Sequence, residues 1–197
     1  MFRQSAILMG LLTASAALLG AALPLSAQGQ MQSTSLLNAD NLDNWDRTGD
    51  ANWRMVDGIA EADMGFGHLV SKDSYGDFTL RVEFWVDDPA NSGIFIRCTE
   101  PEEPSPRSCY EVNIYDERPD ASFGTGGIPN HASVAGIPKI GGQWNIYEIT
   151  VQGDHILVIL NGRKTVDVRD DTYASGPVTL QYGAGVVRFR KVDIRPL

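Results

Sequence analysis

The sequence predicts an all-β protein, folded as a sandwich or a barrel, and three observations lead to this. Apolar residues alternate with polar ones along short segments, most clearly over 78–86, and a helix cannot exploit a period of two. Turn signals containing glycine recur at close spacing. No stretch after residue 30 sustains a helical period. Many short strands with close turns are typical of sandwiches and barrels.

The expected strands run through the second half of the chain and are joined by recognisable turns. They are predicted over 78–86, 93–97, 110–115, 145–152, 155–160, 163–168, 178–182 and 186–194. Gly153-Asp154 and Asn161-Gly162 are typical of tight hairpin turns, so the strands beside them are expected to pair. The segment 119–142 is long and rich in glycine and proline, and loops of that kind are usually functional or mobile.

The N-terminal region has the features of a signal peptide over residues 1–27. Arg3 gives a positive start, residues 5–25 are almost wholly apolar or small, and Ala27 is a small residue suited to cleavage. A retained N-terminal anchor is the alternative, since the apolar run is just long enough to span a membrane. We expect a flexible segment over 28–35 and a single domain over 36–197. The protein is then exported, periplasmic or secreted, with no stable membrane insertion after cleavage.

The net charge of the chain limits the classes of partner that it is expected to bind. The formal net charge is −9, and it becomes −10 once Arg3, the sole charged residue of 1–27, is removed with the leader. An acidic protein repels phosphate backbones, so nucleic acid is not expected as a partner, whereas neutral sugars are not penalised. No cofactor and no metal site are expected. A structural calcium at Asp170-Asp171 or at a cleft carboxylate stays open, although no EF-hand spacing is present.

The two cysteines, Cys98 and Cys109, are expected to form a disulfide if the protein is exported. A metal or redox pair is the weaker alternative, because the spacing fits no zinc pattern. Strict alternation places Cys98 with the apolar Ile96 but Cys109 with the polar Glu111. Either the strands end before the cysteines or the bond does not form.

Three of the predicted strands carry an unusual second face. Its residues are charged, amide or aromatic: Arg81, Glu83, Trp85, Phe95, Arg97, Glu111, Asn113 and Tyr115. If the strands are neighbours in a meander, Glu83, Arg97 and Glu111 meet on one face of one sheet. A solvated face with cross-strand ion pairs is one interpretation. The aromatic residues favour a sugar site instead, because sugars stack on rings and take hydrogen bonds from carboxylates and amides.

A set of segments, in order along residues 36–197, resembles a known family. The segments are 41–45, 53–58, 75–78, 81–84, 91–94 with Arg97, 110–116, 144–145, 161–162, 176–181 and 187–194. They are similar to the 3-keto-disaccharide hydrolases, formerly a domain of unknown function. The resemblance implies a concanavalin A-like jelly-roll β-sandwich of two antiparallel sheets. Asn113 stands where the family usually has glutamine, and the insert 99–108 departs from the family pattern.

The resemblance also implies cleavage of a glycosidic bond in a sugar already oxidised at C3. A carboxylate base would remove the acidified C2 proton, and an acid would protonate the departing oxygen before water adds back. Glu83 and Glu111 are the expected base and acid, in an order left open, and Arg97 is the expected cation. The expected substrate-binding residues are Trp85, Asn91, Phe95, Asn113, Tyr115, Asp116, His131, Gln181 and Arg190.

Several of these residues have a plainer interpretation. Asp116 begins a turn, Gln181 and Arg190 can be ordinary surface residues, and a lone loop histidine such as His131 is usually surface. An ordinary two-carboxylate glycosidase is disfavoured, because 111–116 lacks the central aspartate and final glutamate of the related glucanase motif. A non-catalytic carbohydrate-binding or adhesion module remains the alternative function, since jelly rolls host lectins as well as enzymes.

Overall fold

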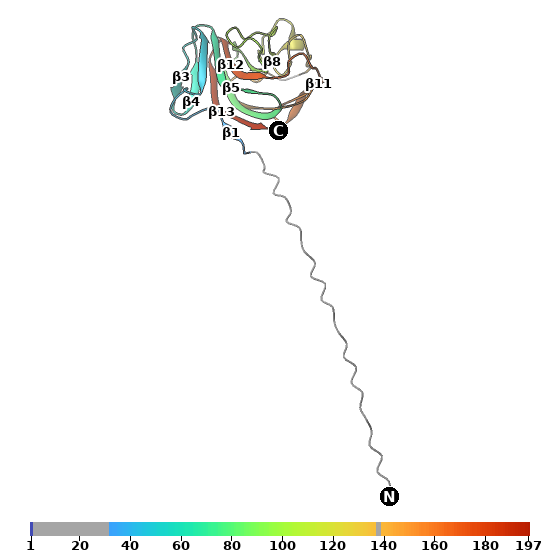
Figure 1. The fold of residues 1–197 in the computed structure, drawn as a ribbon. Helices are drawn as coiled ribbons and strands as arrows, with labels where there is room; N and C mark the ends of the chain where they lie inside the picture. The colour runs from blue at the N-terminus through green and yellow to red at the C-terminus, as the bar shows by residue number, and fades with distance from the viewer. Residues whose placement is uncertain (2–31, 137–138) are drawn as a thin grey trace. The chain divides into compact units, whose positions relative to one another are not determined.

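The structure, a computed structural model, describes residue 1 and residues 32–136 and 139–197. It confirms the all-β prediction, because the described residues form two antiparallel sheets and one short 3-10 turn, η1 (Ala121–Phe123) (Figure 1). The eight-stranded sheet contains β1 (Thr34–Ser35), β3 (Arg54–Val56), β4 (Ile59–Ala62), β6 (Phe78–Val86), β9 (Trp144–Gln152), β10 (His155–Leu160), β11 (Arg163–Arg169) and β13 (Val187–Pro196). The five-stranded sheet contains β2 (Trp45–Gly49), β5 (Gly67–Tyr75), β7 (Asn91–Ile96), β8 (Tyr110–Ile114) and β12 (Gly176–Ala184).

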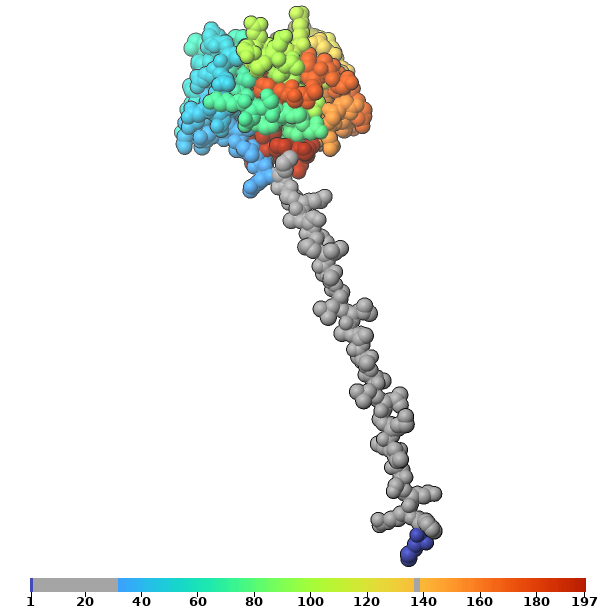
Figure 2. Space-filling model, viewed as in Figure 1, coloured from blue at the N-terminus to red at the C-terminus, as the bar shows by residue number. Residues whose placement is uncertain are grey.

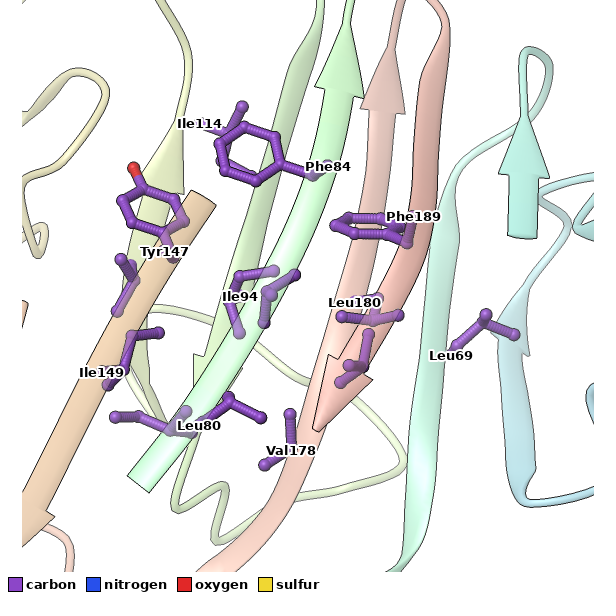
Figure 3. Close-up of a cluster of buried hydrophobic side chains, with 14 of the residues drawn as sticks. Leu69, Leu80, Phe84, Ile94, Ile114, Tyr147, Ile149, Val178, Leu180 and Phe189 are labelled. Carbon is purple, nitrogen blue, oxygen red and sulfur yellow. The ribbon is translucent and has the colours of Figure 1, made fainter. Parts of the chain in front are cut away.

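The core lies between the two sheets and is built from the apolar side of each strand. Every second residue of β6, from Phe78 to Val86, is buried, as its alternation predicts. Side chains of both sheets meet in this layer, among them Leu80, Phe84, Tyr147, Ile149 and Phe189 from one and Leu69, Ile94, Ile114, Val178 and Leu180 from the other (Figure 3). The inner face of each sheet is therefore committed to packing, and only the outer faces are available for chemistry.

The strand order shows that the predicted meander is wrong. β6 lies between β9 and β13 in the eight-stranded sheet, whereas β7 lies between β12 and β8 in the five-stranded sheet. Figure 2 shows a consequence of this order on the surface, where the green residues of β5 lie beside the orange residues of β12, about a hundred positions later. The chain changes sheet after Val86, so β6 and β7 are not neighbours in space, whereas β7 and β8 are. Period-two alternation fixes the face of a residue but not its sheet.

The disulfide between Cys98 and Cys109 is present, with the Cα atoms 4.3 Å apart. β7 ends at Ile96, and Arg97 adopts a left-handed conformation with φ 54°. This break reverses the alternation, so Cys98 lies with Cys109 and Phe95 in a small cluster apart from the main core. Of the two alternatives that the sequence left open, the strands end before the cysteines.

Two further expectations about the chain ends can be compared with the structure. β1 pairs with β13, with Thr34 opposite Ile194, so the ordered domain begins before residue 36. The predicted signal peptide and the start of the predicted flexible segment lie outside the described residues, apart from Met1. Among the residues that are described, no helix is long and apolar enough to cross a membrane.

Candidate functional site

The outer face of the five-stranded sheet carries two rows of side chains that cross four strands. In one row, Asn113 of β8 lies opposite Gly93, Gly93 opposite Gln181, and Gln181 opposite His68 of β5. The neighbouring row joins Glu111, Phe95, Thr179 and Val70 in the same way. We call His68, Glu111, Asn113, Thr179 and Gln181 the polar face. All five are buried, although they lie on the side of the sheet that faces away from the core.

Four residues of the polar face each hold a buried polar atom without a partner among the described residues. These atoms are His68 Nε2, Asn113 Oδ1, Thr179 Oγ1 and Gln181 Oε1. The described part of the chain contains one other such atom, Trp53 Nε1. A buried polar atom without a hydrogen bond costs about 1–3 kcal/mol, so a cluster of four on one face is expensive. Such a cluster is typical of a site whose partners are supplied by a ligand or by water.

Glu111 is the carboxyl group of this face. It is 4% exposed, and burial raises its pKa to about 7, while the positive charge of Arg118 partly opposes the shift. The glycine beside it makes room for its carboxyl group: a Cβ at Gly93 would lie 3.1 Å from Glu111 Oε1 and 3.3 Å from Phe95. Glu111 therefore reaches across β7 towards β12. A carboxyl that titrates near neutral pH can both take and return a proton.

Asn113 and Gln181 present hydrogen-bond acceptors to the same space. The Asn113 side-chain nitrogen donates to the Phe123 carbonyl at 2.7 Å, which fixes the amide so that its oxygen is the free end. Gln181 is 9% exposed, and its Oε1 atom has no partner among the described residues. Both were expected in the site, and the structure places both on the polar face. Acceptors of this kind suit the hydroxyl groups of a sugar.

His68 belongs to the polar face and was missed by sequence reasoning. It is 3% exposed, and burial lowers its pKa to about 4, so the ring is neutral at physiological pH. Its ring contacts Phe95 edge to face at 5.2 Å and Phe66 at 5.8 Å. The available signal was the alternation of β5, because His68 and the apolar Leu69 are consecutive and point to opposite faces of the strand.

Glu83 does not accompany Glu111, so the expectation that the two glutamates share a face is wrong. Glu83 lies on the outer face of the eight-stranded sheet and pairs with Arg81 at 3.0 Å and Arg190 at 2.8 Å. Partial burial alone would raise its pKa, but the hydrogen bonds from the two arginines outweigh burial and lower it. Glu83 is therefore held as an ion-paired carboxylate on the opposite side of the sandwich.

Trp85 and Arg190 lie on that same outer face of the eight-stranded sheet, and each belongs to an arginine–tryptophan pair. The guanidinium of Arg188 stacks over Trp85 at 4.6 Å, and that of Arg190 stacks over Trp144 at 4.2 Å. Cross-strand pairing places Trp85 next to Trp144. A ring face covered by arginine is not open for a sugar, and the geometry makes this a cation–π network within the sheet.

Arg97 was expected to be the cation between the two glutamates, and its position is different. It is 2% exposed, and its guanidinium donates to the carbonyls of Gly76 at 2.9 Å, Gly153 at 2.8 Å and Tyr173 at 3.1 Å. It also donates to the Asp77 carboxylate at 2.9 Å. These partners belong to the β5–β6, β9–β10 and β11–β12 connections, so Arg97 holds these three turns together.

Asp116 and His131 fasten the long loop to the sheets. The Asp116 carboxylate accepts hydrogen bonds from Thr125 Oγ1 and the backbone N–H of Ile140, both at 2.6 Å. The His131 Nδ1 atom lies 2.8 Å from Asp170, and its ring packs on Tyr110 at 4.8 Å. The loop lies along the edge between β8 and β11, since Arg163 donates to the Gly136 carbonyl. Both side chains are therefore committed to this loop.

Of the remaining expected residues, Asn91 and Tyr115 lie at the margins of the polar face and Phe95 lies within it. The Asn91 side chain covers Gly183 of β12, where a Cβ would lie 3.2 Å from the amide. Tyr115 follows Ile114 and lines a pocket of about 270 Å³ together with Thr125 and part of the long loop. Phe95 is fully buried beneath the disulfide, so it is a floor of the face and not an open sugar platform.

The described residues contain no group of three or more histidine, cysteine, aspartate or glutamate side chains placed to hold a metal ion. The sequence left a structural calcium at Asp170-Asp171 open, and Asp170 is engaged through its carboxylate in contacts within the protein. Its carboxylate accepts hydrogen bonds from Tyr110 at 2.6 Å and contacts His131, and the hydrogen bonds from Thr172 and Tyr110 outweigh its burial and lower its pKa. These contacts join β8, the long loop and the β11–β12 turn.

Comparison with known proteins identifies the family of the chain. The 3-keto-alpha-glucoside-1,2-lyase-like domain family matches residues 32–195. The chain belongs to this family. The family resemblance expected from the ordered segments is thereby confirmed. No curated protein matches the chain significantly.

Solved structures share the fold. A provisionally assigned glycosyl hydrolase from Parabacteroides distasonis is 17% identical with a TM-score of 0.75, over 84% of this chain and 94% of that one. A second one from the same organism is 25% identical with a TM-score of 0.70, over 84% and 100%. The carbohydrate-binding module CBM66 from Bacillus subtilis is 14% identical with a TM-score of 0.59, over 85% and 97%. These likenesses confirm the jelly-roll β-sandwich.

Proposed function

We propose that the polar face binds a glycoside oxidised at C3 and cleaves its glycosidic bond, with Glu111 as the base. The observation that carries the proposal is a buried carboxyl with a pKa raised to about 7 beside four polar atoms that lack partners among the described residues. The family description, which refers to a 3-keto-glucoside and to a 1,2-lyase, supports the same chemistry. The sugar-related neighbours support a sugar ligand.

The proposed reaction begins with an elimination across C1 and C2. The ketone at C3 acidifies the C2 proton, and the Glu111 carboxylate takes it, which gives an enolate. The C1–O bond then breaks, a C1–C2 double bond forms, and the proton held by Glu111 passes to the departing oxygen. Water next adds back, with its hydroxyl on C1 and its proton on C2, so the net reaction is hydrolysis. One carboxyl suffices in this scheme, which replaces the expected glutamate pair.

The acceptors on the face orient the sugar. The free oxygens of Asn113 and Gln181 take hydrogen bonds from hydroxyl groups of the ring that carries the ketone. Asn91, which covers Gly183, and Tyr115, which lines the pocket beside β8, are placed to contact the second ring or the leaving group. The ring is thus held by its hydroxyl groups beside the Glu111 carboxyl, which lies over Gly93.

The test is an assay of both anomers of methyl 3-keto-glucoside beside the unoxidised methyl glucosides. The wild-type protein should release 3-ketoglucose from a keto-glucoside only. Glu111→Gln should lose at least about 100-fold in rate, as expected for removal of a general base. Glu83→Gln is the matched control, because Glu83 lies on the other sheet, and it should retain activity. Sugar binding without turnover of any substrate would reject catalysis and favour a carbohydrate-binding module.

We also propose that the protein is exported to the periplasm or beyond. The Cys98–Cys109 disulfide supports this, because disulfides persist mainly in oxidising compartments. The N-terminal 27 residues would act as the cleaved leader. Mass spectrometry of the protein recovered from the periplasm or the medium should find a mature N-terminus at Gln28. Recovery of the full-length chain in the membrane fraction would instead support the retained anchor.

A further inference from the structure

We propose that His68 is a catalytic residue that donates a hydrogen bond from Nε2 to the ketone oxygen of the substrate and to the enolate formed from it. This inference rests on the proposed function, since it names the group that stabilises the negative charge in that reaction. Arg97 was expected in this role, but its guanidinium is taken up by the loops at the end of the sandwich. The reaction therefore needs another donor on the polar face.

The first argument is that His68 and Gln181 are neighbours on the polar face and do not hydrogen-bond each other. Their Cα atoms are cross-strand partners, so their side chains stand next to each other on the face. Yet His68 Nε2 and Gln181 Oε1 are both buried and both lack partners among the described residues. A neighbouring donor and acceptor suit a carbonyl oxygen beside a hydroxyl group. A 3-keto sugar presents that pair, because hydroxyl groups flank its ketone.

The second argument is that the ring is held in place and kept neutral. Phe66 and Phe95 contact it edge to face, and Thr48 Oγ1 lies 3.5 Å from Nδ1. With Thr48 as the donor to Nδ1, the proton of the neutral ring resides on Nε2, the buried atom that has no partner among the described residues. A fixed, neutral donor stabilises a developing oxyanion without giving up its proton.

The third argument is distance. The Glu111 carboxyl lies over Gly93 on β7, and His68 lies on β5, two strands away. Two strand spacings amount to about 10 Å. The path from a base oxygen to C2, on to the ketone oxygen and then to a nitrogen donor spans roughly 8 Å when each contact has hydrogen-bond length. One sugar ring can therefore touch both groups, with Gln181 beneath it.

The experiment compares His68→Phe with the wild type on methyl 3-keto-glucoside. Phenylalanine keeps the packing against Phe66 and Phe95 but has no donor. Loss of one oxyanion donor should lower kcat by about 100- to 1,000-fold, with a smaller change in KM. Exchange of the C2 proton for deuterium, followed by NMR in D2O, should slow in parallel, because the enolate itself is less stable. His155→Phe, at a half-buried histidine on β10 in the other sheet, is the matched control and should behave as wild type.

Each outcome decides the question. Turnover and C2 exchange within about threefold of wild type in His68→Phe would overturn the role of His68 and leave the proposed function standing. A wild-type protein that cleaves no keto-glucoside would reject the proposed function, and the role of His68 with it. If His68→Phe fails to fold, His68→Gln and His68→Met replace it, since they match in size and only glutamine carries a donor. Equal kcat in that pair would also overturn the inference.

Discussion

Glu111→Gln should stabilise the protein, and it should do so only at high pH. The carboxyl is buried, and the step from its ordinary pKa of 4.5 to about 7 corresponds to about 3 kcal/mol. Because the folded pKa is raised, the stability linked to this group is fully present below pH 4.5. It is lost as the pH rises through about 7 and the buried carboxyl ionises. Glutamine has the same shape and does not titrate.

Urea unfolding followed by tryptophan fluorescence at pH 5 and pH 8 measures this effect. At pH 5 the variant and the wild type should differ little, and at pH 8 the variant should be more stable by up to about 3 kcal/mol. Glu83→Gln provides a control of opposite sign, because the ion pairs with Arg81 and Arg190 lower the pKa of Glu83. A gain for Glu111→Gln that is equal at the two pH values would refute the reasoning.

Further predictions address activity, the loop contacts and the floor of the site. The kcat/KM of the wild type should rise about tenfold per pH unit below pH 7 and level off above it, as a pH–rate profile will show, because only the ionised Glu111 acts as a base. Arg97→Ala should lower the free energy of urea unfolding by about 3–5 kcal/mol, because it leaves Asp77 and three carbonyls without their donor. Replacing Cys98 and Cys109 by serine should cost about 3 kcal/mol in the same measurement. Gly93→Ala should reduce turnover far more than stability, since its Cβ would press on the Glu111 carboxyl.

Sequence reasoning predicted the faces of the strands but not their assembly. The alternation of β6 and β8 correctly separated core residues such as Val82 and Val112 from outward ones such as Glu83 and Glu111. Which sheet a strand joins depends on pairings far along the chain, such as β6 with β13, and no local pattern contains that information. The predicted grouping of Glu83 with Glu111 failed at this step.

The predicted site was incomplete for a related reason. His68 lies on a strand that contributes one polar residue to the face, so the alternation of β5 gives its face but does not indicate chemistry. Its membership of the polar face becomes evident only from the pairing of β5 with β12, which places His68 beside Gln181. Arg97, in contrast, was placed by extending the alternation of β7 one residue too far. Its left-handed backbone, with φ 54°, ends the strand and turns the side chain to the loops.

The two glutamates show how one sandwich separates structural from chemical faces. Both stand on an outward face of a central or edge strand, and both are largely covered. Arg81 on the same strand and Arg190 on the neighbouring strand β13 pair with Glu83 and keep it ionised. Glu111 has only the more distant charge of Arg118 to oppose its burial, so its proton is bound weakly enough to leave and strongly enough to return near neutral pH. The same burial that destabilises the fold at high pH is therefore the property that suits Glu111 to its proposed role as the base.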